Sequence, residues 1–171
     1  MRNSKPSQKV VFVDRDGVIN WDPVGDYIKH WKHFRFLPGV IPSLKKLSDQ
    51  NFRIILISNQ AGIGDGEYTE AALRDITLNM LQKLEQKKVK IDSVYYCLHG
   101  KKEGCTCRKP KTLMFRLASK NISYVKNKTF YIGDKATDVE AGKRFGLKTI
   151  MVLTGHGFKD RRILKNGFFQ L

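Results

Sequence analysis

The sequence lacks long apolar runs, and this absence excludes a membrane-spanning protein. Its longest apolar stretches, at residues 53–57 and 149–153, have the length of a strand, whereas a membrane helix needs roughly 20 apolar residues. Residues 1–9 are polar and lack the apolar segment of a secretory signal peptide, so we expect a cytoplasmic protein. Hydrophobic residues make up 41% of the chain, which excludes a disordered protein.

Acidic residues are scarce, since 16 Asp and Glu stand against 32 Lys and Arg, for a net charge of +16. Such an excess favours anionic partners, namely nucleic acid, membrane surfaces or phosphorylated metabolites. The basic residues are spread evenly, with no basic arm that could wrap around nucleic acid. We therefore expect a small phosphorylated metabolite as the partner, rather than a membrane or nucleic acid. The oligomeric state stays open.

Only three cysteines are present, Cys97, Cys105 and Cys107, and an odd number argues against a disulfide framework. Together with His99 they form a set of three thiols and one imidazole, which is typical of a closed structural zinc site. The alternative is a chance cluster of reduced thiols. Because the protein would supply all four ligands, Zn²⁺ should stabilise the loop at 97–107 rather than catalyse a reaction.

Strand and helix patterns alternate along the chain, which predicts an α/β fold with a central parallel sheet. Right-handed crossovers make such a sheet a doubly wound, Rossmann-like three-layer sandwich, with its site beyond the carboxyl ends of the strands. We expect a single domain over residues 1–171. The predicted strands are 9–13, 54–58, 93–96, 129–132 and 148–153, and the predicted helices are 38–50, 69–88, 112–120 and 136–145.

Polar and charged residues follow four of the predicted strands and should meet at one edge of the sheet. They are Asp14 and Asp16, then Ser58, Asn59 and Gln60, then Arg108 and Lys109, and finally Asp134 and Lys135.

Carboxylates dominate this group. Asp14 and Asp16 are two residues apart, which predicts that both side chains point the same way. With Asp134 they could form an oxygen site for Mg²⁺, although Asp14 and Asp16 could also belong to a simple turn. Ser58, Arg108 and Lys109 add the donors that phosphoryl transfer needs. We expect a structural role for Asp138, either capping a helix or holding Lys135.

Four motifs resemble those of the haloacid dehalogenase-like phosphatases. They are residues 14–20 (DRDGVIN), 58–60 (SNQ), 108–110 (RKP) and 133–138 (GDKATD). The match is closer to the branch that joins the D-glycero-D-manno-heptose 1,7-bisphosphate 7-phosphatases and the histidinol-phosphatases. The resemblance covers roughly residues 9–155, and the same class of Cys and His spacing occurs in both families.

The resemblance implies roles that the residues alone leave open. Asp14 would be the nucleophile that forms an aspartyl-phosphate, and Asp16 the general acid and then the base. Mg²⁺ would lie between Asp14, the Asp16 backbone carbonyl and Asp134. Ser58 and Lys109 would hold the phosphoryl group, and Arg108 would recognise the substrate. We add Asn59, Gln60 and Lys135 to the predicted phosphate-binding set.

The intervals between the motifs leave no room for a cap domain. We expect an open site, closed only by a flap at about 21–36 and by the zinc loop at 97–107. Residues 25–28 (GDYI), the segment 59–70 and Lys135 resemble the heptose enzymes. The stretch 136–138 and the short loop at 105–111 resemble the histidinol enzymes. Charge matching favours the sugar bisphosphate.

The predicted function is a Mg²⁺-dependent phosphomonoesterase that removes the 7-phosphate of D-glycero-D-manno-heptose 1,7-bisphosphate. The alternatives are a histidinol-phosphatase, a 3′-phosphatase acting on nucleic-acid ends, and a zinc-stabilised nucleic-acid-binding module. The basic segment 155–171 carries Phe158, Ile163, Leu164, Phe168 and Phe169. It is interpreted as a closing helix or a partner contact. His156 follows Thr154 and Gly155 and could reach the site, but we expect it on the surface.

Overall fold

The computed structural model describes residues 7–23, 25–120 and 122–163. Five parallel strands form one sheet in the order β3-β2-β1-β4-β5. The chain thus moves outward from β1 in both directions, which confirms the doubly wound sheet. The strands are β1 (Val10–Val13), β2 (Arg53–Asn59), β3 (Ile91–Cys97), β4 (Phe130–Gly133) and β5 (Lys148–Met151).

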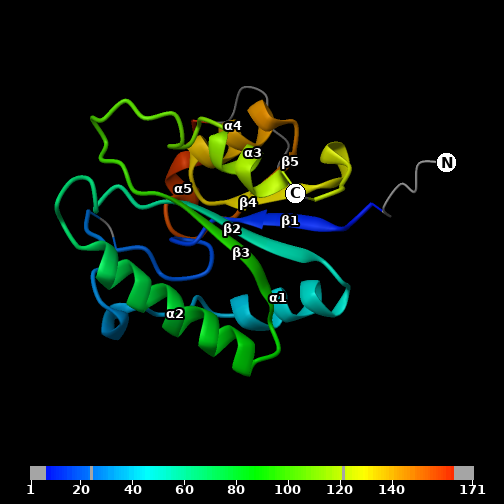
Figure 1. Ribbon diagram of the computed structural model, residues 1–171, viewed down its shortest axis with the longest axis horizontal. Helices are drawn as coiled ribbons and strands as arrows, with labels where there is room; N and C mark the ends of the chain where they lie inside the picture. Colours follow the sequence, from blue (N-terminus) through cyan, green and yellow to red (C-terminus); the bar gives the residue numbers. More distant parts are fainter. Residues whose placement is uncertain (1–6, 24, 121, 164–171) are drawn as a thin grey trace.

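Helices cover both faces of the sheet and complete three layers (Figure 1). One face holds α1 (Val40–Asp49) and α2 (Glu70–Gln86), and the other holds α3 (Leu113–Ser119) and α4 (Ala136–Phe145). Three short helices complete the described chain: η1 (Trp31–His33), η2 (Lys126–Lys128) and α5 (Gly157–Asp160). Within the described residues, no helix combines the length and apolar character that crossing a membrane requires.

The strands are apolar because both of their faces are buried. In β1, Val10 and Phe12 pack in the cluster with α3 and α4, whereas Val11 and Val13 pack in the cluster with α1 and α2. A strand covered on both sides gives a continuous apolar run in place of an alternating one. The strand boundaries differ slightly from the sequence prediction, since β3 already begins at Ile91, where it pairs with Ile54, and β5 ends at Met151.

At the carboxyl edge of the sheet β1 and β4 end nearly level, whereas β2 continues to Asn59. Val13 pairs with Leu56 on one side and with Ile132 on the other. The chain therefore leaves three neighbouring strands at the same edge, which brings the residues that follow β1, β2 and β4 together.

No cap domain interrupts the described part of the chain. The predicted flap begins where Trp21 N–H donates to the Arg35 carbonyl oxygen (2.9 Å), and a bridge between Asn20 and Phe36 closes its base. Ile28 and Phe34 of the flap are buried in the core on the α2 side. At the other end of the chain, Leu164, Phe168 and Phe169 lie outside the described residues.

Candidate active site

Three carboxyl groups are buried together where β1 and β4 end. Asp14, Asp134 and Asp138 each place a carboxylate oxygen within 4.8 Å of the others. Burial and the nearby charge of Asp14 raise the pKa of Asp134 to about 8. Asp134 Oδ1 is buried and accepts no hydrogen bond from the described residues. An unpartnered, buried carboxylate oxygen beside a second carboxylate fits Mg²⁺, which prefers hard oxygen ligands.

Two glycines let the backbone close around Asp134. A Cβ atom on Gly17 would lie 2.2 Å from Asp134 Oδ2, and one on Gly155 would lie 2.3 Å from the same oxygen. Both glycines also have positive φ angles, of +79° and +53°, which L-residues with a side chain rarely adopt. The loops after β1 and β5 thereby hold Asp134 Oδ2, which accepts a hydrogen bond from His156 N–H (2.8 Å).

The Lys109 ammonium is buried and contacts two of these three carboxyl groups. Its Nζ is 2.9 Å from Asp14 Oδ1, 2.7 Å from Asp138 Oδ1, 2.7 Å from the Tyr131 hydroxyl and 3.2 Å from the Ile57 carbonyl oxygen. Burial alone would lower the pKa of Lys109, but Asp138 and Asp14 outweigh it and raise that pKa. Lys109 is therefore a fixed positive charge beside Asp14, as a phosphate-binding group should be.

The two carboxylate oxygens of Asp138 have different partners. Its Oδ2 caps α4 by accepting hydrogen bonds from Asp134 N–H (3.2 Å) and Lys135 N–H (3.0 Å). Its Oδ1 binds Lys109. Capping was one of the two roles expected from the sequence, whereas the alternative partner, the Lys135 ammonium, pairs with Asp22 instead.

The Asp16 carboxylate does not belong to the group formed by the other three and has its own hydrogen-bond partners. It accepts hydrogen bonds from Arg15 Nη2 (2.9 Å), Asn20 Nδ2 (2.9 Å) and Gln60 Nε2 (2.8 Å). The strand ends at Val13 and the chain turns directly afterwards, so the strand alternation behind the prediction that both side chains point the same way does not extend to Asp16. Burial opposes ionisation of Asp16, but the Arg15 charge and the hydrogen bonds outweigh it and lower its pKa.

The polar side chains at the end of β2 and directly after it hold other residues of the site. The Asn59 amide brackets the Lys109 backbone, accepting from its N–H (3.0 Å) and donating to its carbonyl oxygen (3.3 Å). Gln60 donates to Asp16 and to Ser58 Oγ (3.1 Å) and accepts from the Tyr68 hydroxyl (2.6 Å). Asn59 and Gln60, predicted to contact the phosphate, thus have side chains that hold Lys109 and Asp16 in place.

Charged side chains form the rim of the site. Asp22 of the flap lies 3.0 Å from Lys135 Nζ and 3.3 Å from His156 Nε2. His156, expected on the surface, therefore belongs to the site. Arg108 is half-buried, and its Nη1 has no hydrogen-bond partner among the described residues. That nitrogen is itself buried.

Sequence reasoning missed Tyr131, Asp22 and the supporting contact made by Thr154. Thr154 Oγ1 donates to the Gly17 carbonyl oxygen (2.5 Å), which joins this loop to the turn after β1. A signal existed for Tyr131, because a tyrosine within a strand buried on both faces needs a partner for its hydroxyl. Asp22 gave no such signal, since its partners come from the distant loops after β4 and β5.

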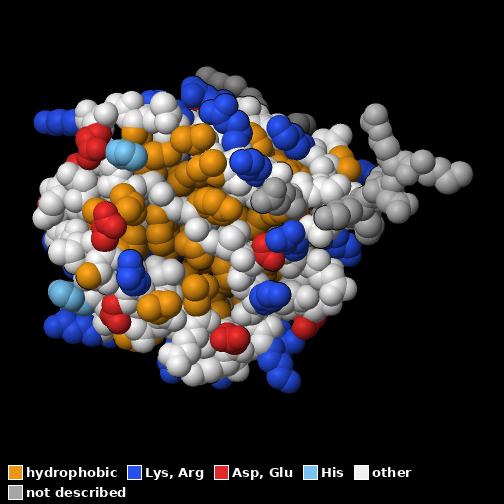
Figure 2. All heavy atoms as spheres, viewed as in Figure 1, with side chains coloured by type: hydrophobic (Ala, Val, Ile, Leu, Met, Phe, Trp, Pro, Cys, Tyr) orange, Lys and Arg blue, Asp and Glu red, His pale blue; other side chains and the backbone are white. Residues whose placement is uncertain are grey.

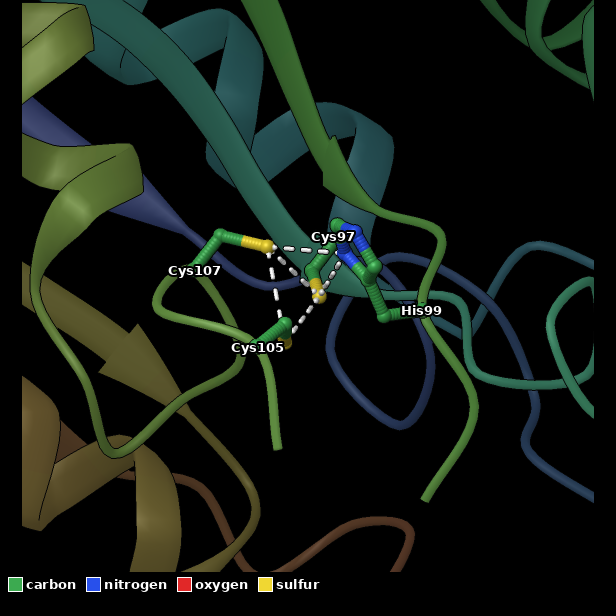
Figure 3. A group of neighbouring side chains, drawn as sticks. All are labelled: Cys97, His99, Cys105 and Cys107. Carbon is green, nitrogen blue, oxygen red and sulfur yellow. Dashed lines mark hydrogen bonds between the residues drawn. The ribbon is translucent and has the colours of Figure 1, made fainter. Parts of the chain in front are cut away.

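The four predicted zinc ligands converge into one cluster beside the site (Figure 3). Cys107 Sγ lies 3.0 Å from Cys97 Sγ, 3.7 Å from Cys105 Sγ and 3.2 Å from His99 Nδ1. Cys97 Sγ lies 3.6 Å from Cys105 Sγ. Tetrahedral Zn²⁺ with bonds of about 2.0–2.3 Å requires ligand atoms at roughly such separations. The donor set and its spacing fit a closed zinc site, and none of the three cysteines forms a disulfide.

Known proteins resemble this chain in both sequence and fold. A family profile described as "HAD-hyrolase-like" matches residues 106–166. The D-glycero-beta-D-manno-heptose-1,7-bisphosphate 7-phosphatase of Pasteurella multocida is 37% identical over 155 residues, covering 86% of this chain and 83% of the relative. The chain belongs to the haloacid dehalogenase-like phosphatases.

Two further relatives place this haloacid dehalogenase-like phosphatase within the family. The D,D-heptose 1,7-bisphosphate phosphatase from B. bronchiseptica, solved with magnesium and phosphate, superimposes with a TM-score of 0.89 at 29% identity, covering 96% of this chain and 92% of that one. The Histidine biosynthesis bifunctional protein HisB of Campylobacter jejuni is 34% identical over 143 residues, covering 83% of this chain but 41% of the relative.

Proposed function

We propose that this phosphatase removes the 7-phosphate of D-glycero-D-manno-heptose 1,7-bisphosphate. The observation that carries the proposal is the buried Asp14 carboxylate, which faces the Lys109 ammonium at 2.9 Å and lies beside the unpartnered oxygen of Asp134. A nucleophilic carboxylate, a fixed cation and a site for a metal ion are the parts that phosphoryl transfer requires.

The chemistry divides between Asp14 and Asp16. An Asp14 oxygen attacks phosphorus and the bond from phosphorus to the sugar oxygen breaks. Because the pKa of Asp16 is lowered, Asp16 must first take up a proton, which it then passes to the leaving oxygen. Water then attacks the aspartyl-phosphate while Asp16 takes its proton, which releases inorganic phosphate and restores Asp14. Hydrogen bonds from Arg15, Asn20 and Gln60 hold Asp16 in one orientation for both steps.

Asp14 and Asp134 would hold the Mg²⁺ ion, with the Asp16 backbone carbonyl as a further ligand. When bound, Mg²⁺ neutralises charge on the phosphoryl oxygens. Lys109 supplies a second positive charge and Ser58 a hydroxyl at the same place. Asn59 keeps Lys109 in position through both of its backbone groups.

The substrate assignment rests on the charge at the rim of the site and on the names of the relatives. Lys135 offers a partly exposed ammonium and Arg108 a half-buried guanidinium, so the positive charge of the rim suits an ester that carries a second phosphate. The relatives from Pasteurella multocida and B. bronchiseptica are named for the heptose bisphosphate. Structural Zn²⁺ on Cys97, His99, Cys105 and Cys107 would hold the loop that leads into Arg108 and Lys109. Three reduced thiols support a cytoplasmic location.

The proposal is tested by measuring the phosphate released in the presence of Mg²⁺. Heptose 1,7-bisphosphate, histidinol phosphate and a 3′-phosphorylated oligonucleotide are assayed in parallel. We expect a preference for the heptose ester of about a hundredfold in kcat/KM, or about 2.7 kcal/mol. Asp14→Asn should abolish turnover. Asp49→Asn should leave it unchanged, because this exposed carboxylate on α1 pairs with Lys45 and with no other cation among the described residues. Turnover of none of the three esters would refute the substrate assignment.

Histidinol phosphate is the second candidate because HisB is among the relatives and the loop between the two pairs of zinc ligands, at 100–104, is short. A cationic substrate needs a nearby carboxylate. Asp22 is the acidic residue on the rim, and it is already paired with Lys135. A preference for histidinol phosphate that Asp22→Asn removes would establish this alternative.

A further inference from the structure

Gln60 joins two groups of the active site through one side-chain nitrogen. Its Nε2 donates to Asp16 Oδ2 (2.8 Å) and to Ser58 Oγ (3.1 Å), and the residue is 1% exposed. Arg15 and Asn20, which also bind the Asp16 carboxylate, are its neighbours in the sequence. Gln60 instead comes from the segment that follows β2. Its amide therefore connects the general acid to the phosphate-binding end of another strand.

This contact depends on what meets the other end of the Gln60 amide. An ionised carboxylate accepts hydrogen bonds and donates none, so the amide nitrogen must face Asp16. The amide oxygen, Oε1, then faces the opposite way, inside the protein. A buried acceptor without a donor is destabilising, and a side chain left in that state moves to find a partner. Gln60 can hold Asp16 in place because a donor reaches Oε1.

The Tyr68 hydroxyl is that donor. It lies 2.6 Å from Gln60 Oε1, and both side chains are buried. Burial raises the pKa of Tyr68, so the hydroxyl keeps the proton that it donates. The chain of contacts from the Tyr68 hydroxyl through the Gln60 amide to the Asp16 carboxylate thus has a donor facing an acceptor at each step.

A glycine and the flap fix the Tyr68 ring. A Cβ atom on Gly62 would lie 2.4 Å from Tyr68 Cε1, so the ring needs the space that this glycine leaves. The Tyr27 ring of the flap packs against it at 5.9 Å between centroids, and nearby Lys29 pairs with Glu67 (3.0 Å). Figure 1 places the flap and the loop between β2 and α2 at one end of the molecule, where Figure 2 shows acidic and basic side chains close together.

We propose that Tyr68 is a positioning residue for the general acid, because its hydroxyl holds the Gln60 amide that fixes the Asp16 carboxylate. The role rests on the proposed function, in which Asp16 gives a proton to the leaving oxygen. With an alkyl ester, Asp14 bonds to phosphorus, the bond to the alkyl oxygen breaks, and the Asp16 proton completes the alcohol. With a nitrophenyl ester the same bonds form and break, but nitrophenolate leaves as a stable anion and needs no proton.

Two classes of ester therefore separate this role from a general structural one. Heptose 1,7-bisphosphate and histidinol phosphate are alkyl esters, and p-nitrophenyl phosphate is the aryl ester. Consumption of each is measured with Mg²⁺ and with enzyme in excess, so that the first chemical step is observed. Tyr68→Phe should slow cleavage of the alkyl ester about tenfold and that of the aryl ester less than about twofold. No loss with the alkyl ester, or an equal loss with both, overturns the proposal.

Two further variants show which side chain carries the effect. Tyr27→Phe is the matched control, because it removes a hydroxyl that has no hydrogen-bond partner among the described residues from the ring packed on Tyr68. It should leave both rates unchanged. Gln60→Leu should slow the alkyl ester at least as much as Tyr68→Phe does. Adding Tyr68→Phe to Gln60→Leu should cost nothing more, since Tyr68 acts through Gln60, and losses that multiply would contradict the proposal.

A measurement without substrate keeps the test independent of the reaction. In ¹⁵N-labelled protein, Gln60→Leu identifies the side-chain amide signals of Gln60 by removing them. Tyr68→Phe should shift these signals and speed their exchange with water, whereas Tyr27→Phe should not. A wild-type protein that cleaves none of the esters refutes the proposed function. Unchanged Gln60 signals in Tyr68→Phe refute the role of Tyr68.

Discussion

Tyr131 gives the sharpest test of how the active site is built. Its hydroxyl lies between two charged groups, accepting a hydrogen bond from Lys109 Nζ (2.7 Å) and donating one to Asp138 Oδ1 (3.0 Å). Tyr131→Phe removes both hydrogen bonds. The ring can stay in place because it packs edge-on against Phe115 at 4.9 Å between centroids.

The magnitude follows from the charges on both partners. A hydrogen bond to a charged group contributes about 1.5–3 kcal/mol, so the free energy of unfolding should fall by about 2 kcal/mol. Catalysis should suffer as well. Without the tyrosine donor, Asp138 Oδ1 competes more strongly for the protons of Lys109, which must also bind the phosphoryl group. A loss of about 1.4 kcal/mol of this contact lowers kcat about tenfold.

Denaturant unfolding and released phosphate measure the two effects, with Tyr124→Phe as the matched control. Tyr124 packs against the same core cluster, but its hydroxyl contacts the neutral Ser119 Oγ at 2.6 Å. Its loss should reduce stability by about 1 kcal/mol and leave kcat unchanged. If Tyr131→Phe keeps kcat within about twofold of the wild type, or if both variants lower kcat equally, Tyr131 does not position Lys109.

Three other perturbations test the supporting structure. Cys107→Ser should lower Tm and raise KM together, and zinc analysis should show lost metal. Because the pKa of Asp134, about 8, exceeds its ordinary 3.8, the folded metal-free chain retains a proton that the unfolded chain has lost. Its stability should therefore fall as pH rises between these values, and the gain in Tm from Mg²⁺ should grow. Gly17→Ala should abolish activity by displacing Asp134, whereas Gly39→Ala, at a similar φ with open space around it, should only lower stability.

The sequence by itself determined the architecture and most of the site. Strands of a parallel sheet that helices cover on both faces are apolar throughout, so each strand is visible in the sequence as a continuous apolar run. Residues that follow such strands meet at one edge whatever their separation in the chain, which is why Asp14, Lys109 and Asp134 could be grouped from motifs alone. The cluster of Cys97, His99, Cys105 and Cys107 was visible because its members are close in sequence.

Only the tertiary structure decided where the side chains point beyond the strand ends. Periodicity stops at Val13, so the direction of the Asp16 side chain depended on the turn at Gly17 and on Gln60, which follows β2. Asp138 reached Lys109 through a contact between the loop after β3 and α4. These features arise from contacts between distant segments, whose geometry a local pattern of residues does not encode.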